Sequence, residues 1–143
     1  MDRRKFLKQS CQACLLGVAG IATASSITAC STSNSVLKLT ANNSVVSVPV
    51  ASFANKKTII VRTEDAEFDV ALHETENKTY KAFVLSCTHH ENPLNITGSG
   101  FICTLHGSQY NLDGQVKKGP ASKPLKEYQT RINGDAVEIL LNT

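Results

Sequence analysis

The sequence predicts an all-β protein made of small antiparallel sheets. The main observation is a series of short runs rich in Val, Ile, Phe and Tyr, which have the length and composition of strands. These runs cover residues 45–50, 58–62, 68–72, 80–85, 127–132 and 136–141. Turn residues separate them, and Asp113-Gly114 and Asn133-Gly134 have the composition of tight hairpin turns. No segment after residue 44 repeats its apolar residues with a helical period, so we expect one globular β domain over residues 45–143.

Residues 1–29 have the layout of an export leader. Paired arginines, Arg3-Arg4, precede Lys5-Phe6-Leu7-Lys8, and an apolar stretch of small residues continues to Ala29. This order is similar to a twin-arginine export signal, which implies export of a protein that has already folded. The leader ends Ile27-Thr28-Ala29-Cys30, which resembles a lipobox in which Cys30 becomes the lipidated N-terminus. An uncleaved signal anchor is the alternative. Under both hypotheses the domain is tethered to a membrane and lies on the exported side of the bacterial cytoplasmic membrane or in the periplasm.

The composition of the remaining chain limits the classes of partner. Residues 30–44 are rich in Ser, Thr and Asn, and we expect them to form a flexible tether. Beyond residue 29 the chain carries 11 basic and 11 acidic residues, so this part is neutral. A neutral domain gives no reason to expect nucleic acid as a partner.

Cysteine and histidine occur together in two places. Cys87-Thr88-His89 follows one predicted strand, and Cys103-Thr104-Leu105-His106 begins after 13 intervening residues. A disulfide between the two cysteines is one interpretation, but it would leave both histidines unexplained. A Cys₂His₂ zinc site has the right ligand count. A two-iron cluster, with both thiolates on one iron and both imidazoles on the other, uses the same four side chains.

Two further histidines need a place in these hypotheses. His90 is next to His89, and the C-x-H spacing makes it an exposed neighbour rather than a ligand. His73 lies in a predicted strand region, where we expect it at the surface.

The two loops and the segment that follows them resemble the Rieske [2Fe–2S] family. The resemblance rests on C-T-H, C-T-L-H-G-S and a downstream proline loop, Gly119-Pro120-Ala121 with Pro124-Leu125. It implies a Rieske-type fold of small antiparallel sheets with a two-loop cluster-binding subdomain, and one [2Fe–2S] cluster per chain. The implied ligands are Cys87, His89, Cys103 and His106, and the implied hydrogen-bond donors to the sulfur atoms are Ser108 and Tyr110.

The sequence also departs from the respiratory members of this family. The positions that correspond to their loop-bracing disulfide are Asn92 and Leu105, so in this respect the chain is similar to the Rieske ferredoxins of aromatic-ring dioxygenases. His90-Glu91 replaces the leucine that helps respiratory members dock at a quinol site. Ser108 and Tyr110, by contrast, match the high-potential respiratory members.

The resemblance implies one-electron transfer rather than stand-alone catalysis. We expect a membrane-tethered carrier, or an electron-transfer subunit of a quinol- or substrate-oxidising complex. Its partners would be a quinol-linked donor or an oxidoreductase large subunit, and a cytochrome-type acceptor. The alternatives are the small subunit of an exported molybdenum oxidoreductase, similar to that of arsenite oxidase, and a zinc-binding lipoprotein. Lys117, Lys118, Lys123 and Lys126 surround the proline loop, either as solvated lysines or as a positive docking patch.

Overall fold

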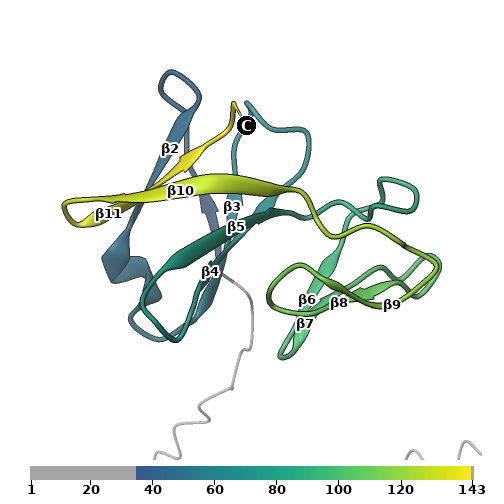
Figure 1. The fold of residues 1–143 in the computed structure, drawn as a ribbon. Coiled ribbons are helices and arrows are strands. Elements are labelled where there is room, and N and C mark those ends of the chain that lie inside the picture. Colours follow the sequence, from purple (N-terminus) through teal and green to yellow (C-terminus); the bar gives the residue numbers. More distant parts are fainter. Residues whose placement is uncertain (1–34, 143) are drawn as a thin grey trace, which may run out of the picture. The chain divides into compact units, whose positions relative to one another are not determined.

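The computed structural model describes residues 35–142, which form two β-sheets (Figure 1). The leader and Cys30 lie outside the described residues. Within residues 35–142 no helix has the length and apolar character needed to cross a membrane. The helical content described is a single 3-10 turn, η1 (Val50–Phe53). The expected all-β class is confirmed.

The larger sheet has seven strands in the order β1-β3-β4-β5-β10-β11-β2. All neighbours pair antiparallel except β1 and β3, which run parallel. The edge strands β1 and β2 are consecutive in the chain and joined by residues 39–44, so the sheet curls round one core. The strand bounds are β1 (Val36–Lys38), β2 (Val45–Pro49), β3 (Thr58–Arg62), β4 (Val70–Glu74), β5 (Tyr80–Val84), β10 (Glu127–Asn133) and β11 (Ala136–Leu140).

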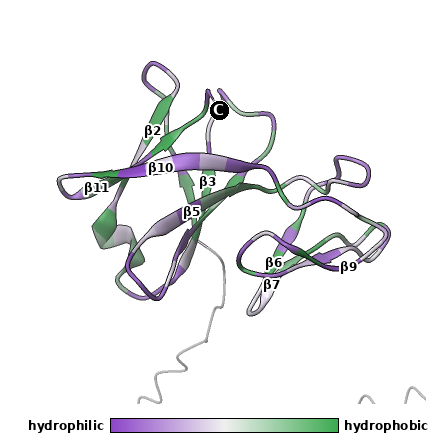
Figure 2. Ribbon diagram, viewed as in Figure 1, coloured by the Kyte–Doolittle hydropathy of each residue, from purple (hydrophilic) through white to green (hydrophobic). Residues whose placement is uncertain are grey.

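Alternating apolar residues fill the core of this sheet. Val46 and Val48 of β2 face Val137 and Ile139 of β11, and all four side chains are fully buried. Because successive side chains of a strand point to opposite faces, the residues between them reach solvent or its margin. Figure 2 shows β2 and β11 in the hydrophobic colour, whereas most of β10 is hydrophilic, in keeping with its mostly exposed residues.

The smaller sheet is inserted between β5 and β10 and carries the two loops of interest. Its four antiparallel strands run in the order β6-β7-β8-β9. A second core packs it against the larger sheet, where the rings of Phe83 and Phe101 meet edge to face with centroids 5.8 Å apart. The bounds are β6 (Asn95–Thr97), β7 (Gly100–Ile102), β8 (Gln109–Tyr110) and β9 (Val116–Lys118).

One glycine allows the strands of this sheet to approach closely. Gly100 opens β7 with φ of 146°, a conformation that side chains of L residues rarely adopt. A Cβ atom at this position would collide with the carbonyl oxygen of Tyr110 on β8. Gly100 therefore permits the strand pairing that positions Tyr110.

The structure corrects two expectations from the sequence and confirms a third. Strand β1 lies within the segment 30–44 that was expected to be a flexible tether, so the folded part begins earlier than residue 45. Asp113-Gly114 lies in the turn of a hairpin, as expected: residues 111–115 join the antiparallel strands β8 and β9, and the Gly114 N–H donates to the Asn111 carbonyl (3.0 Å). His73 is 8 % exposed rather than at the surface, and its Nδ1 lies 2.8 Å from Thr58 Oγ1.

Candidate metal centre

The two Cys–His loops share one backbone hydrogen-bond pattern. In each loop the cysteine N–H donates to the carbonyl five residues later, and the cysteine carbonyl accepts from the N–H four residues later. Each loop also ends on a residue with left-handed backbone, Glu91 (φ 46°) in the first and Gly107 (φ 80°) in the second. The bonds join Cys87 to Asn92 (2.8 Å) and Glu91 (2.7 Å), and Cys103 to Ser108 (2.8 Å) and Gly107 (2.9 Å).

This pattern brings both thiols into the interior and both imidazoles outward. Cys87 is 2 % exposed and Cys103 is 1 % exposed, and both are free thiols in the second core. The His89 and His106 rings lie side by side, with centroids 5.1 Å apart and planes at 82°. His106 is exposed, whereas His89 is half-buried. The four predicted ligands therefore converge, as two sulfur and two nitrogen donors.

The structure distinguishes His89 from its neighbour His90. By position in the loop, His90 rather than His89 corresponds to His106. His90 is three residues after Cys87, as His106 is three residues after Cys103. The His90 ring is exposed and lies 4.2 Å from that of His89 and 5.7 Å from that of His106. The Nδ1 atom of His89, by contrast, is buried without any hydrogen-bond partner. Because buried polar atoms are nearly always paired, this nitrogen is the one available to a metal.

The donors fit a [2Fe–2S] cluster of the mixed-ligand kind. Such a cluster takes a thiolate pair on one iron and an imidazole pair on the other, which is the grouping that the two loops present. Burial, followed by the nearby His90 and His106, lowers the pKa of His89, so its ring is neutral and can bind metal at pH 7. Within residues 35–142 no three or more His, Cys, Asp or Glu side chains are arranged to hold a single ion.

The Cys87 sulfur lies within a set of hydrogen bonds that favours its thiolate. The hydroxyl of Tyr110 is 3.5 Å from Cys87 Sγ. Burial raises the pKa of the Cys87 thiol, but the hydrogen bonds outweigh burial and hold the pKa below its ordinary value. They come from Tyr110, from the backbone at His89, from Cys103 and from Ser108.

Tyr110 keeps the proton that it needs as a donor. Burial and its hydrogen bond to Cys87 raise the pKa of this phenol above its ordinary value. The hydroxyl also accepts a hydrogen bond from the Thr88 N–H (3.1 Å) and lies 3.0 Å from Thr88 Oγ1. Tyr110 thus connects β8 to the first loop between its cysteine and its histidine.

Thr88 and Ser108 fasten the proline loop, residues 119–125, over this site. Thr88 Oγ1 donates to the carbonyl of Lys123 (2.7 Å), and the Ala121 N–H donates to Ser108 Oγ (3.0 Å). Since Ser108 accepts this bond, its own proton remains available to a sulfur atom. The sequence analysis did not identify Thr88 as a residue of the site. Its position between Cys87 and His89 was the available signal, because a hydroxyl there can reach a loop that covers the site.

The proton count at Thr88 has a consequence for the Cys87 sulfur. The single hydroxyl proton of Thr88 is directed at the Lys123 carbonyl, which only accepts. Thr88 Oγ1 can therefore only accept from Tyr110. The oxygen of Thr88 and the sulfur of Cys87 thus compete for the one hydroxyl proton of Tyr110.

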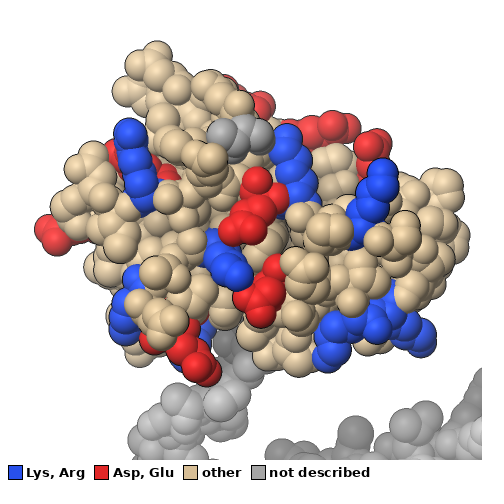
Figure 3. All heavy atoms as spheres, in the orientation of Figure 1, with Lys and Arg blue, Asp and Glu red and all other residues tan. Residues whose placement is uncertain are grey.

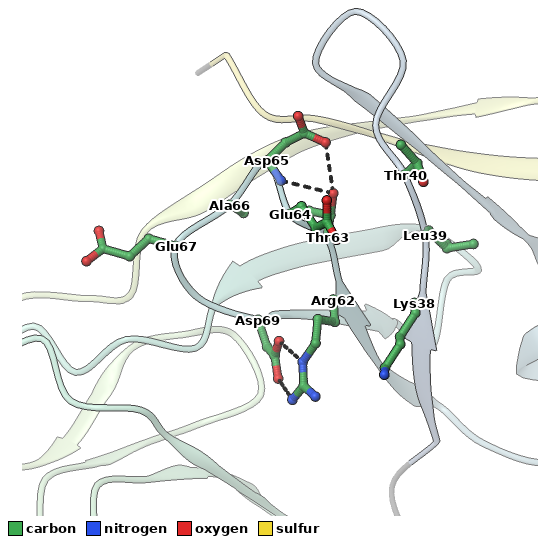
Figure 4. Close-up of a pocket in the computed structure, with 10 residues that line it drawn as sticks. All are labelled: Lys38, Leu39, Thr40, Arg62, Thr63, Glu64, Asp65, Ala66, Glu67 and Asp69. Atoms are coloured by element: carbon green, nitrogen blue, oxygen red, sulfur yellow. Dashed lines mark hydrogen bonds and ion pairs between the residues drawn. The ribbon is translucent and has the colours of Figure 1, made fainter.

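A cavity of about 590 Å³ lies beside the loop of residues 63–69 (Figure 4). There the guanidinium of Arg62 faces Asp69 across two hydrogen bonds of 2.8 and 2.6 Å. Asp65 turns back toward its own loop and accepts from Thr63 Oγ1 (3.1 Å). No cysteine or histidine is among the described residues that line this cavity.

The fold and the two loops together define an iron–sulfur electron-transfer protein of the Rieske class. The chain belongs to the Rieske [2Fe–2S] domain family, whose family model matches residues 43–129. It therefore carries a [2Fe–2S] cluster and acts in electron transfer.

Among curated proteins, the chain is similar to iron–sulfur subunits of the cytochrome b6-f complex. It is 33 % identical over 90 residues to subunit 2 of Nostoc sp., an alignment that covers 63 % of this chain and 46 % of the relative. It is 35 % identical over 90 residues to subunit 1 of Synechocystis sp., with the same coverage of 63 % and 46 %. The chain thus spans about half the length of the curated relatives that it matches.

Solved structures share the fold. The cyanobacterial plasma membrane Rieske protein of Synechocystis PCC 6803 aligns with a TM-score of 0.56 at 24 % identity, over 64 % of this chain and 93 % of that one. A chain from the complex of reduced oxygenase and oxidized ferredoxin in carbazole 1,9a-dioxygenase aligns with a TM-score of 0.54 at 18 % identity, over 69 % and 94 %.

Proposed function

We propose that the protein is a membrane-tethered one-electron carrier, or an electron-transfer subunit of a quinol- or substrate-oxidising complex, on the exported side of a bacterial membrane. Cys87 and Cys103 would bind one iron of its cluster, and His89 and His106 the other. The observation that carries this assignment is the unpaired, buried Nδ1 of His89, beside the His106 ring and in the same loop as the buried thiol of Cys87.

The burial of these four side chains suits one-electron transfer. The bound cluster supplies a metal centre that gains or loses one electron. The buried thiols and the proline loop exclude water from the sulfur side, whereas the exposed ring of His106 offers a short route to a partner at the surface. The polar pair His90-Glu91 suits an apolar quinone pocket poorly, so we place the quinol chemistry on the donor rather than on this chain.

The cytochrome b6-f relatives support a quinol-linked donor and a cytochrome-type acceptor. Reductive titration of the purified full-length protein tests the proposal. We expect one electron per chain, with the visible and electron paramagnetic resonance spectra of a cluster that has two histidine ligands. A colourless protein that contains zinc would contradict the proposal, as would the spectrum of a cluster with four cysteine ligands.

We also propose that residues 1–29 are removed and that Cys30 carries the lipid. We expect the protein extracted from membranes to begin at Cys30 and to exceed the peptide mass by that of a lipid anchor. Intact-mass measurement checks this, with Cys30→Ser as the control that loses the added mass. A mature protein that still begins at Met1 would show an uncleaved anchor instead.

A further inference from the structure

Charge is unevenly distributed between the two sheets. Beyond residue 29 the chain is neutral, but residues 86–126, which hold the smaller sheet and both loops, carry four basic and two acidic residues. Of the two acids, Asp113 is already paired with Lys81 of the larger sheet (2.7 Å), which leaves Glu91. The four basic residues are Lys117, Lys118, Lys123 and Lys126, and all are exposed.

Backbone contacts place two of these lysines beside the loops. Lys123 is held to the first loop by the bond from Thr88 Oγ1 to its carbonyl (2.7 Å). Lys118 pairs with Gln109, directly after the second loop. Lys126 lines a cavity of about 360 Å³ together with Cys87 and Thr88, and with two carboxylates, those of Glu67 and Glu91. Figure 3 shows blue side chains gathered in the lower right of the view, where Figure 1 places β8 and β9, with no Asp or Glu visible among them.

The second loop also exposes an apolar side chain. Leu105 is 57 % exposed, and among the described residues Val36 and Ile132 are the other large exposed hydrophobic side chains. Leu105 directly precedes His106 in the sequence, and His106 is exposed as well. Protein interfaces commonly combine a small apolar centre with a polar rim, and the rim charges set the rate of encounter.

Protection of a sheet edge explains only part of the pattern. Lysines on an edge strand discourage pairing with other chains, and Lys117 and Lys118 lie on the edge strand β9. Lys123 and Lys126 lie outside any strand, so edge protection does not require them. Edge protection therefore does not account for these two charges, although Lys126 also lies over the ring of Tyr128, 5.0 Å from its centroid.

We propose that these four lysines, together with the exposed Leu105 and His106 of the second loop, form the docking surface for an electron-transfer protein with an acidic face. The proposal rests on the proposed function, because it assumes that the electron leaves by His106. An acidic partner would be steered to the lysines over a distance set by ionic strength, and would then bring its own redox centre to the imidazole.

Two inorganic oxidants of opposite charge test the field at this surface. Reduced full-length protein is mixed with hexacyanoferrate(III), an anion, or with a tris-chelate of cobalt(III), a cation; each takes one electron from the cluster, which becomes diferric. Raising the ionic strength from about 0.01 M to about 1 M shortens the screening length from about 30 Å to about 3 Å. We expect the rate with the anion to fall about tenfold and the rate with the cation to rise.

The variant Lys123→Gln with Lys126→Gln isolates the lysines that lie outside the strands. It should lose most of the salt dependence with both oxidants while keeping the spectrum of the cluster. The matched control, Lys57→Gln with Lys78→Gln, removes the same charge from exposed positions in the loops that flank β3 and join β4 to β5, where Lys78 pairs with Glu74 (3.0 Å). It should keep the salt dependence.

Two results would overturn the docking proposal alone. One is an equal effect of both double variants, and the other is the same salt dependence for both oxidants. Loss of binding to vesicles of anionic lipid in the Lys123/Lys126 variant, with unchanged oxidation rates, would assign the surface to lipid headgroups instead. Failure of both oxidants to remove an electron from the reduced protein would overturn the proposed function itself.

Discussion

Replacement of any one of the four proposed ligands is expected to abolish the cluster. Cys87→Ser, Cys103→Ser, His89→Ala and His106→Ala each remove a donor from a site that has only two donors per iron. We expect complete loss of visible absorbance in each variant, whereas His90→Ala keeps the full spectrum. The reason is that His89 Nδ1 is buried without a partner, whereas the His90 ring is exposed.

His90→Ala is also the sharpest control for this series, because His90 occupies in its loop the place that His106 occupies in the other. Circular dichroism of each variant separates loss of the cluster from loss of the fold. A colourless His90→Ala protein together with a coloured His89→Ala protein would reassign the ligand. His73→Ala is less suitable, because His73 is buried against Thr58.

The midpoint potential of the cluster is expected to be positive at neutral pH, although the two loops contain no cysteine besides Cys87 and Cys103. Rieske centres span roughly −150 to +300 mV. Hydrogen bonds to the sulfur atoms raise the potential because they stabilise the more negative, reduced state. The Tyr110 hydroxyl lies 3.5 Å from Cys87 Sγ, and the proton of Ser108 is not used by the proline loop.

The double variant Ser108→Ala with Tyr110→Phe should lower this potential and keep the cluster. A hydrogen bond worth ~1.5–3 kcal/mol to a charged group corresponds to roughly 65–130 mV for a one-electron couple, as an upper limit per bond. Protein-film voltammetry measures the shift. A wild-type midpoint below about −50 mV, toward the lower end of the Rieske range, or an unchanged midpoint in the double variant, would show that the hydroxyls do not act on the sulfur atoms.

Thr88→Val provides a comparison of opposite sign. It removes the oxygen that competes with Cys87 Sγ for the Tyr110 proton, so the midpoint should rise. Thr88→Ser keeps the hydroxyl and should keep the wild-type potential. A fall in Thr88→Val would mean instead that the bond to the Lys123 carbonyl, by holding the proline loop closed, matters more than the competition.

The sequence could predict the fold class because apolar alternation is a local property. In β2 and β11 one face meets the core and the other meets solvent, so the period of two is visible in the residues themselves. The predicted ligand set rests equally on local spacing, since each loop is closed by hydrogen bonds within six residues of its cysteine. Cysteine and histidine at these spacings restrict the chemistry before the fold is known.

Strand β4 shows why other features stayed hidden. All five of its residues are buried, because Val70 and Leu72 face the larger core while Ala71 faces the second core. A strand covered on both sides has no polar face to mark its register, so His73 was wrongly expected at the surface. Strand β1 could not be predicted from the sequence either. Its few residues follow a polar segment, and only their pairing with β3 makes them a strand.

By itself, therefore, the sequence determined that this is an all-β protein with two Cys–His loops suited to a [2Fe–2S] cluster. The tertiary structure alone decided which imidazole has a buried, unpaired nitrogen and which residues control the sulfur of Cys87. Thr88, Tyr110 and Lys123 meet through hydrogen bonds that join residues 22 and 35 positions apart. Contacts over such separations depend on how the sheets pack, and no local pattern of residues encodes them.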